Sequence, residues 1–314
     1  MNSILYIIMP AFNEEEVIEE SISLVSEKLR SLVKGKKICK DSKVVVIDDG
    51  SKDKTFDILR NLNNNNLVII KLSRNCGHQN AMYAGLMYAK DRADITISMD
   101  CDLQDDIDVI DKMVVEYYKG NEIVYGVRNN RDTDTFLKRN SAIMFYKFMS
   151  FLGVNIVSNH ADYRLMSKKS LEALSMYEES NLFLRGIIPN LGFKTSKVYY
   201  KRLERKAGVS KYNLRKMFGL AMDGITSFSI KPIRMIIGIG AIFSFLSVLY
   251  IIYVISGYFL GADYVSGWAS TIAFICFFGS FQILCVGIIG EYISKIYLET
   301  KRRPRYIIEE IIEK

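Results

Sequence analysis

Residues 100–105 hold the side chains of this sequence that are best suited to bind a metal ion. Asp100, Asp102 and Asp105 follow directly on an apolar and β-branched run at residues 95–99, and Gln104 lies among them. A buried strand that runs into a carboxylate cluster offers oxygen ligands to a hard divalent cation such as Mg²⁺ or Mn²⁺. Taken alone, the pattern is equally compatible with a solvated acidic turn after a strand.

Polar residues also follow the other expected strands. Asn13, the pair Asp48 and Asp49, Arg74 and Arg128 each come after a separate apolar run. Ligands of parallel sheets bind outside the carboxyl ends of the strands, so these side chains are expected to meet at one sheet edge. The alternative for 48–51 is a strand-end turn in which one Asp caps the next helix. The expected strands are residues 4–9, 44–47, 67–72, 95–99 and 123–125.

Helical periodicity connects these strands. Apolar residues between Ile18 and Leu32 recur at steps of four and three, which predicts an amphipathic helix. Asn13 followed by Glu16 resembles a capping box for it. Strands that alternate with helices predict an α/β fold with a mostly parallel, Rossmann-like sheet and flanking helices. Further helices are expected at residues 53–61, 77–89, 107–118 and 136–152, and a short extended piece at 162–166.

The last third of the chain has the composition of a membrane anchor. Residues 194–234 contain eleven Lys or Arg against two acids, and an amphipathic helix is expected at 212–231. Such a segment suits an anionic membrane surface, although a core-packed helix is the alternative. Two uncharged runs, 235–255 and 264–290, are each long enough to span a bilayer of about 30 Å. Basic flanks place both ends in the cytoplasm by the positive-inside rule.

These patterns divide the chain into five expected parts. Residues 1–211 form a cytoplasmic catalytic domain, 212–231 the juxtamembrane helix, 232–257 and 264–290 two transmembrane helices, and 291–314 a basic cytoplasmic tail.

The apolar run at 4–9 lacks a basic leader and is too short for a signal peptide, so we expect a strand there. Five Cys without a paired framework indicate reduced thiols that face the cytosol or the membrane. A net charge of +7 favours an anionic partner or surface.

Six segments in this order resemble the inverting family-two glycosyltransferases of GT-A fold. More narrowly, they resemble the polyprenyl-phosphate glycosyltransferases, which include bactoprenol glucosyltransferases and dolichyl-phosphate mannose synthases. The family usually has prolines after D-L-Q-D, whereas this chain has Asp106 and Ile107, a departure that affects the start of the next helix. The segments are Ile8–Glu15 (IMPAFNEE), Val45–Thr55 (VVIDDGSKDKT), Leu72–Ala81 (LSRNCGHQNA), Met99–Asp105 (MDCDLQD), Asp162–Met166 (DYRLM) and Arg205–Tyr212 (RKAGVSKY).

The resemblance implies transfer of a hexose from a nucleotide diphosphate sugar to a lipid phosphate. Asp100 and Asp102 would hold Mg²⁺ or Mn²⁺ against the charge of the leaving diphosphate. Arg74 could contact phosphate or be a surface charge, and Gln104 and Asp105 could touch the donor sugar. The residues that would cradle the base and ribose are Pro10, Phe12, Glu14, Asp48 and Asp49.

Asp162 is the implied catalytic carboxylate. A phosphate acceptor is largely ionised near pH 7, so this residue would orient the acceptor more than deprotonate it. We interpret the nearby His160 as a surface or capping residue. Arginine suits phosphate because it donates two parallel hydrogen bonds. Candidates for the acceptor phosphate are Arg139, Arg185, Arg202, Arg205 and Lys211, with Arg128 available to either phosphate.

Several alternatives are open. UDP-glucose is the first choice of donor, and UDP-galactose, an N-acetylhexosamine donor or GDP-mannose are the others. A processive polysaccharide synthase would carry a Q-x-x-R-W motif and more spans, but the single Trp, Trp268, lies in or beside a span. A non-catalytic membrane scaffold would not need the acidic and arginine positions. We expect partners to be the donor, undecaprenyl phosphate, the cell membrane and possible copies of the chain itself, with no nucleic acid.

Overall fold

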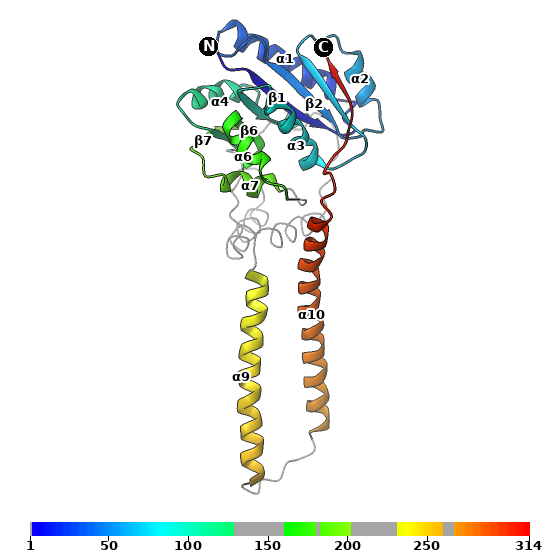
Figure 1. Ribbon diagram of the computed structural model, residues 1–314, viewed down its shortest axis with the longest axis vertical. Helices are drawn as coiled ribbons and strands as arrows, with labels where there is room; N and C mark the ends of the chain where they lie inside the picture. Colours follow the sequence, from blue (N-terminus) through cyan, green and yellow to red (C-terminus); the bar gives the residue numbers. More distant parts are fainter. Residues whose placement is uncertain (1, 129–159, 180–182, 202–230, 260–266) are drawn as a thin grey trace. The chain divides into compact units, whose positions relative to one another are not determined.

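The computed structural model describes residues 2–128, 160–179, 183–201, 231–259 and 267–314 (Figure 1). The chain separates into two compact units. The first contains the described residues up to Lys201 together with Arg303–Lys314, and the second contains the two long helices up to Arg302. The helix expected at 136–152 lies outside the described residues, as does all but the last residue of the helix expected at 212–231.

The first unit is built on an eight-stranded sheet in the order β7-β5-β6-β4-β1-β2-β3-β8. The central strands β4, β1, β2 and β3 are parallel, as the alternation of strands and helices predicted. β6 and β8 run antiparallel to their neighbours, so the sheet is mixed. The strands are β1 (Leu5–Ala11), β2 (Lys43–Asp48), β3 (Leu67–Leu72), β4 (Ile95–Ser98), β5 (Ile123–Arg128), β6 (His160–Ser167), β7 (Thr195–Tyr200) and β8 (Ile308–Glu313).

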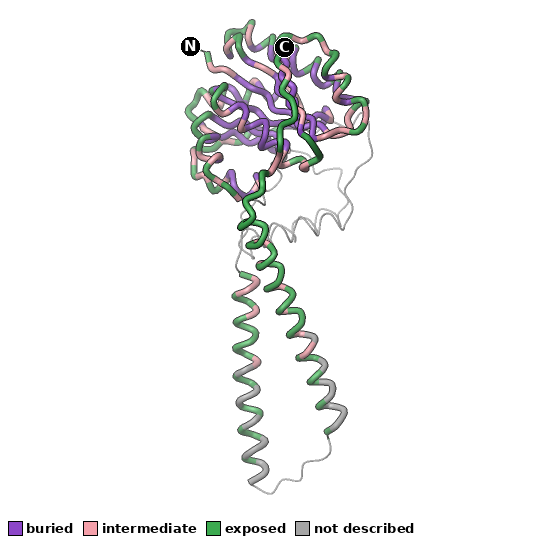
Figure 2. The backbone as a smooth tube through the Cα atoms, turned by 45° about the vertical axis from the view of Figure 1, so that its right-hand side comes forward, coloured by how far each residue is buried: buried purple, intermediate pink, exposed green. Residues whose placement is uncertain are grey.

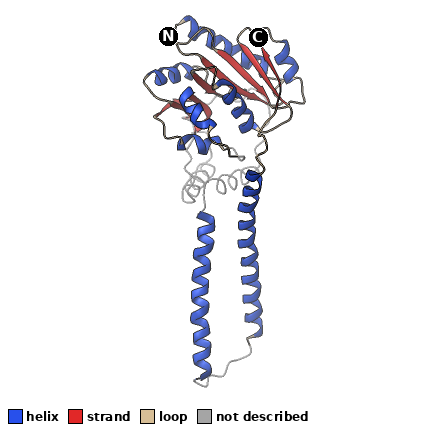
Figure 3. Ribbon diagram, viewed as in Figure 1, coloured by secondary structure: helices blue, strands red, loops and turns tan. Residues whose placement is uncertain are grey.

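Helices cover both faces of this sheet, and the strands between them are buried (Figures 2 and 3). The apolar stripe of α1 is fully buried against the face of β1 that carries Leu5, Ile7 and Met9, and α4 contributes to the same cluster. On the other face α3 approaches closely, because a Cβ on Gly85 would lie 2.4 Å from Ile8. The helices are α1 (Ile18–Lys34), α2 (Thr55–Asn61), α3 (His78–Ala89), α4 (Val109–Tyr118), α6 (Lys168–Ser175) and α7 (Leu184–Asn190).

The predicted capping box at the start of α1 is wrong. The helix begins at Ile18, and its first turn receives no side-chain cap. Asn13 instead has a left-handed φ of 53° and binds the loop after β2, donating its N–H to Ser51 Oγ and accepting from Lys52 N–H. The side chain of Asn13 therefore binds the loop after β2 and does not cap α1, contrary to what the local sequence pattern predicted.

The end of the chain returns to the sheet. We expected residues 291–314 to form a basic tail, but Ile308–Glu313 form β8, which pairs antiparallel with β3. Lys71 and Lys43 of neighbouring strands bind Glu309 and Glu313 at 2.8 and 3.2 Å. Two acidic residues of this segment thus have lysine partners across the sheet.

The second unit consists of α9 (Lys231–Phe259) and α10 (Trp268–Thr300). These helices cover most of the two expected spans, and α10 continues ten residues beyond the expected end at 290. Phe243 of α9 packs its ring edge-on against Phe278 of α10, with ring centres 5.4 Å apart. Within the described residues, the segment Phe277–Thr300 is long and apolar enough to cross a membrane.

Candidate active site

Three neighbouring parallel strands bring the acidic residues to one edge of the sheet. Ala11 at the end of β1 is in register with Asp48 at the end of β2, and β4 leads into Asp100 on the other side of β1. Cys101 is buried at this point, with its Sγ 3.3 Å from the carbonyl oxygen of Pro10. Ser21 of α1 donates to the Cys101 carbonyl at 2.6 Å. The turn between the two carboxylates of 100–102 is therefore anchored on β1 and α1.

Asp100 has an oxygen that is prepared for a ligand. Its Oδ1 is buried and accepts no hydrogen bond within the described part of the chain, and the nearest cation, His78 Nε2, lies 3.6 Å away. Burial raises the pKa of Asp100 to about 6; His78 opposes this shift, and the negative charges of Asp162, Asp105 and Asp102 add to it. A divalent ion would stabilise the charged form of such a carboxylate, which lies close to three other carboxylates.

The two carboxylates of 100–102 fit a metal that is shared with the donor. Among the described residues, no group of three or more His, Cys, Asp and Glu side chains is arranged to hold a metal ion. Asp102 Oδ1 accepts the N–H of Gln104 at 3.2 Å, and Leu103 between them has a left-handed φ of 56°. Mg²⁺ in nucleotide sites is commonly bound by one or two carboxylates plus substrate phosphates, so a two-carboxylate site is sufficient.

Asp105 belongs to a cluster formed by three strand ends. Its Oδ1 accepts hydrogen bonds from Tyr200 of β7 at 2.5 Å and from Arg128 of β5 at 3.2 Å. Arg128 Nε also donates to the Tyr200 hydroxyl at 3.2 Å. Asp105 is 2 % exposed, and its Oδ2 accepts no hydrogen bond from any described residue. Arg128 thus serves first as the counter-ion of Asp105.

Asp162 is bound by donors on both oxygens. Arg164 and Arg185 donate to Oδ1 at 2.5 and 3.2 Å. Arg185 also donates to Oδ2 at 2.9 Å, where His78 Nε2 at 3.3 Å and Gln79 Nε2 at 3.4 Å converge. Burial would raise the pKa of Asp162, but the hydrogen bond from His78 and the two guanidinium groups hold it well below its usual range. This carboxylate remains ionised and is a poor proton acceptor.

His78 links the acidic turn to Asp162. Its Nε2 lies 3.6 Å from Asp100 Oδ1 and 3.3 Å from Asp162 Oδ2. Burial opposes protonation, but the bond to Asp162 and the charge of Asp100 raise the pKa of His78 above its ordinary value. A cationic imidazole between the two carboxylates lowers their mutual repulsion.

Asp48 and Asp49 have different roles. Asp49 accepts the N–H groups of Cys76 and Gly77 at 2.7 and 2.9 Å, which fixes the loop that leads into α3. Asp48 Oδ1 accepts the N–H of Ser51 at 3.3 Å, whereas its buried Oδ2 has no hydrogen-bond partner in the described residues. Burial raises the pKa of both carboxyl groups. Asp48 is therefore the better candidate for a ribose contact, and Asp49 holds the loop.

Comparison with known proteins identifies the family. Residues 6–175 match the model of Glycosyl transferase family 2, and residues 231–296 match that of the GtrB C-terminal hairpin. The chain belongs to glycosyl transferase family 2. This family-2 transferase is 49% identical over 308 residues to "Uncharacterized glycosyltransferase YkoT" of Bacillus subtilis (strain 168), covering 98% of this chain and 91% of that one. It is 38% identical to the "Bactoprenol glucosyl transferase" of Shigella phage SfX, covering 96% and 98%.

A solved structure aligns with the transferase more distantly. Glucosyl-3-phosphoglycerate synthase from Mycobacterium tuberculosis, in complex with Mn²⁺, UDP and glucosyl-3-phosphoglycerate, is 16% identical. The match covers 71% of this chain and 78% of that chain with a TM-score of 0.43. The matched family models and the mixed, mostly parallel sheet establish a GT-A fold with a C-terminal hairpin.

The remaining predicted residues of the transferase divide into two groups. Pro10 is buried at the end of β1, Phe12 and Glu14 are half-buried in the following loop, and Gln104 is buried beside the acidic turn. Arg74 is exposed in the loop between β3 and α3. All five lie in segments that follow the carboxyl ends of the parallel strands. Four predicted phosphate contacts, Arg139, Arg202, Arg205 and Lys211, lie outside the described residues, as does the side chain of His160.

Four residues of the cluster were not predicted from the sequence: His78, Gln79, Arg164 and Tyr200. His78 and Gln79 directly follow the loop that carries Arg74, so their position after a parallel strand was a usable signal. Arg164 lies two residues from Asp162, and alternate residues of a strand share one face, which would have predicted the ion pair. Tyr200 reaches Asp105 across 95 residues of sequence, and no local pattern indicates that contact.

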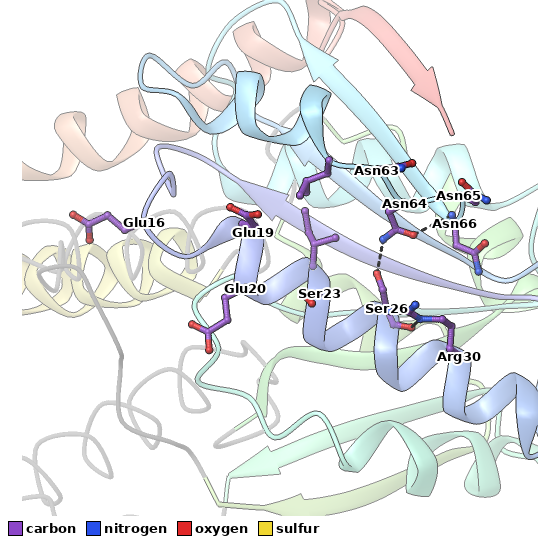
Figure 4. Close-up of a pocket in the computed structure, with 12 residues that line it drawn as sticks. Glu16, Glu19, Glu20, Ser23, Ser26, Arg30, Asn63, Asn64, Asn65 and Asn66 are labelled. Atoms are coloured by element: carbon purple, nitrogen blue, oxygen red, sulfur yellow. Dashed lines mark hydrogen bonds between the residues drawn. The ribbon is translucent and has the colours of Figure 1, made fainter.

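The transferase also has a polar groove of about 920 Å³ away from these residues (Figure 4). It lies between α1 and the connection that precedes β3, where Asn64 Nδ2 donates to Ser26 Oγ at 2.7 Å. None of the carboxylates at the carboxyl ends of the strands lines it. The residues of the groove at 62–66 come directly before the amino end of β3, whereas ligands of such sheets bind at the carboxyl ends of the strands.

Proposed function

We propose that this transferase moves a hexose, with glucose as the first choice, from a UDP-sugar to a polyprenyl phosphate such as undecaprenyl phosphate. Transfer proceeds with inversion and yields a lipid-linked sugar for modification of cell-envelope glycans. The proposal is supported by 38% identity to a bactoprenol glucosyl transferase over nearly the whole chain and by the match to the GtrB hairpin. GDP-mannose as donor, in the manner of dolichyl-phosphate mannose synthases, is the alternative.

The observation that carries this proposal is the contact of His78 with both Asp100 and Asp162. It joins an acidic turn suited to a metal-bound diphosphate to a carboxylate that holds Arg185. The side chain of Arg185 is 39% exposed, so it can bind an incoming phosphate while one edge remains on Asp162. Donor and acceptor phosphates would thus lie on opposite sides of one imidazole.

Each residue then has a specific task. Mg²⁺ or Mn²⁺ held by Asp100 and Asp102 would supply Lewis-acid stabilisation of the leaving diphosphate. Asp48 would bind the ribose and Asp105 a hydroxyl of the sugar, because each has an oxygen that accepts no hydrogen bond from the described residues. Asp162 would not remove a proton, since a phosphate acceptor is already largely ionised near pH 7. It would instead hold Arg185 in position for the acceptor.

The match to the GtrB hairpin supports a membrane location for this reaction. We propose the cell membrane, with the catalytic unit and both ends of the chain in the cytoplasm, because basic residues flank the long apolar helices on one side of each. The polyprenyl chain of the acceptor would remain in the bilayer while its phosphate reaches the site. A small homo-oligomer assembled through the hairpin is compatible with the mostly exposed apolar residues of α9 and α10.

Product analysis tests the proposal. The full chain in detergent or nanodiscs is incubated with undecaprenyl phosphate, Mg²⁺ or Mn²⁺, and each of a panel of nucleotide sugars, and the lipid product is identified by mass. We expect a hexosyl-phosphate lipid from UDP-glucose and its loss in Asp102→Ala. Asp108→Ala is the matched control, because the side chain of Asp108 is exposed and, in the described contacts, binds Lys28. Full metal-dependent transfer by Asp102→Ala would exclude the assigned metal site.

A further inference from the structure

The last twelve residues, Arg303–Lys314, fasten the chain to the loop and helix that carry His78. We call this segment the C-terminal strap. Its β8 part pairs with β3 up to Leu72, and the next residue, Ser73, donates its N–H to the Ile307 carbonyl at 3.0 Å. Tyr306 packs edge-on against Tyr83 of α3, with ring centres 6.5 Å apart. The strap therefore borders the same β3–α3 loop that Asp49 holds from the other side.

Arg305 of the strap binds two separate elements of the catalytic unit. Its guanidinium lies over the ring of Tyr83, 4.7 Å from the ring centre, and its Nη2 donates to the carbonyl oxygen of Tyr177 at 2.7 Å. Tyr83 is buried in α3, and Tyr177 follows α6 in the connection to α7. One side chain thus joins two elements that are almost one hundred residues apart in sequence.

α3 supplies two of the donors of Asp162, and Tyr177 lies eight residues before a third donor, Arg185. His78 and Gln79 come from the first turn of α3, and Gln79 lies four residues before Tyr83, on the same face of the helix. Arg185 comes from α7. Gln79 already connects the two, because its Nε2 donates to Asp162 and its Oε1 accepts the N–H of Leu184. Arg305 makes a second connection, from Tyr83 of α3 to Tyr177 after α6.

We propose that Arg305 is a positioning residue, which keeps α3 and the end of α6 at the spacing that lets His78 and Arg185 meet on Asp162. This inference rests on the proposed function, since it assigns Arg185 to the acceptor. It also gives one basic residue after α10 a role within the catalytic unit, where the sequence predicted only a basic tail. Arg302 and Arg303 are exposed, as expected of charges that flank a membrane span, whereas Arg305 is half-buried and bound to named partners.

The test compares Arg305→Ala, Arg305→Lys and the control Arg303→Ala in the full chain in nanodiscs. We expect Arg305→Ala to lower kcat by about 10- to 100-fold, because small misplacements of reacting groups cost rates of this order. The KM for the nucleotide sugar should change less than about twofold, since the donor carboxylates are not contacted. Arg305→Lys should recover part of kcat, because an ammonium can still bind the Tyr177 carbonyl and the Tyr83 ring. Arg303→Ala removes the same charge and should leave transfer unchanged.

Hydrogen exchange separates this proposal from the proposed function. Arg305→Ala should speed exchange in residues 73–79 and 183–190 while exchange in β1 and β2 is unchanged. This result would support the positioning role even if the wild-type chain transferred no sugar to lipid, an outcome that refutes only the proposed function. The positioning role is excluded if Arg303→Ala reduces kcat as strongly as Arg305→Ala. It is also excluded if Arg305→Ala leaves exchange in both segments unchanged, or raises it throughout the unit.

Discussion

Replacing Asp162 by Asn tests whether this residue acts as a base or as the anion that holds two arginines. The substitution keeps the shape of the side chain and removes its charge. Arg164, 1% exposed in its side chain, would then have no carboxylate partner, and removal of one partner from a buried ion pair costs about 3–5 kcal/mol. Arg185 adds little to this loss, because its side chain is 39% exposed and such pairs contribute about 0–1 kcal/mol.

Thermal unfolding of the full chain in nanodiscs measures this loss. For a unit of this size, 1 kcal/mol corresponds to about 2–4 °C in Tm, so Asp162→Asn should unfold about 6–20 °C below wild type. The double variant Asp162→Asn with Arg164→Met removes both buried charges and should recover most of the loss, because replacing a buried ion pair by apolar groups is often neutral. Transfer activity should be lost in both variants.

The pH dependence has a defined sign. The pKa of Asp162 is lowered in the folded state, so its stabilising effect is fully present above the unfolded pKa of about 3.9 and is lost as pH falls below that value. The Tm difference between wild type and Asp162→Asn should therefore narrow below pH 4. It should also become smaller as the pH rises through the raised pKa of His78, because the ion pair between His78 and Asp162 is lost when the imidazole gives up its proton. If Asp162→Asn abolishes transfer but melts within about 2 °C of wild type, the charge-holding role is refuted and a catalytic base is the better interpretation.

Two further predictions concern the acidic edge. Asp100→Asn should raise the Tm of the metal-free chain at pH 7 by an amount equivalent to about 1–2 kcal/mol, because the pKa of Asp100 is raised to about 6 and its negative charge at pH 7 therefore destabilises the folded chain. The substitution should also abolish any rise in Tm on adding Mn²⁺, and a lower Tm would contradict this reasoning. Gly50→Ala should destabilise by about 1–3 kcal/mol in the same assay, because φ is 66° there and a Cβ would lie 2.7 Å from the backbone of Arg74 and Asn75; an unchanged Tm would contradict it.

The central strands and α1 were predictable because the buried positions of strands and helices are apolar and recur with a regular period in the sequence. Every apolar position of the Ile18–Leu32 repeat is buried, and residues 67–72 form β3 with the expected bounds. The meeting of Asp48 and Asp100 at one edge follows from the parallel order alone. The strand β8 could not be predicted in this way, since its Glu residues are compensated by Lys43 and Lys71, which lie more than two hundred residues earlier.

The division of labour among the carboxylates also required the structure. Asp48 and Asp49 are neighbours with the same chemistry, and only the position of the loop at Cys76 and Gly77 decides which of them is used internally. Likewise, the sequence suggested Arg128 as a phosphate contact, but Tyr200 and Asp105 bind it from two other strand ends. Such contacts form between segments that are distant in the sequence, and the local periodicity of the sequence does not predict them.

The carboxylates at this edge fall into two kinds when their oxygens are compared. Asp49 and Asp162 have hydrogen-bond donors on both oxygens, whereas Asp48, Asp100 and Asp105 each have one buried oxygen that accepts no hydrogen bond from the described residues. A buried polar group without a partner costs about 1–3 kcal/mol, so three at one edge are expensive to the fold. We infer that a bound donor satisfies them, with its ribose at Asp48, its sugar at Asp105 and its metal-bound diphosphate at Asp100. The two fully paired carboxylates instead hold the loop at Cys76 and Gly77 and Arg185, the arginine that we assign to the acceptor.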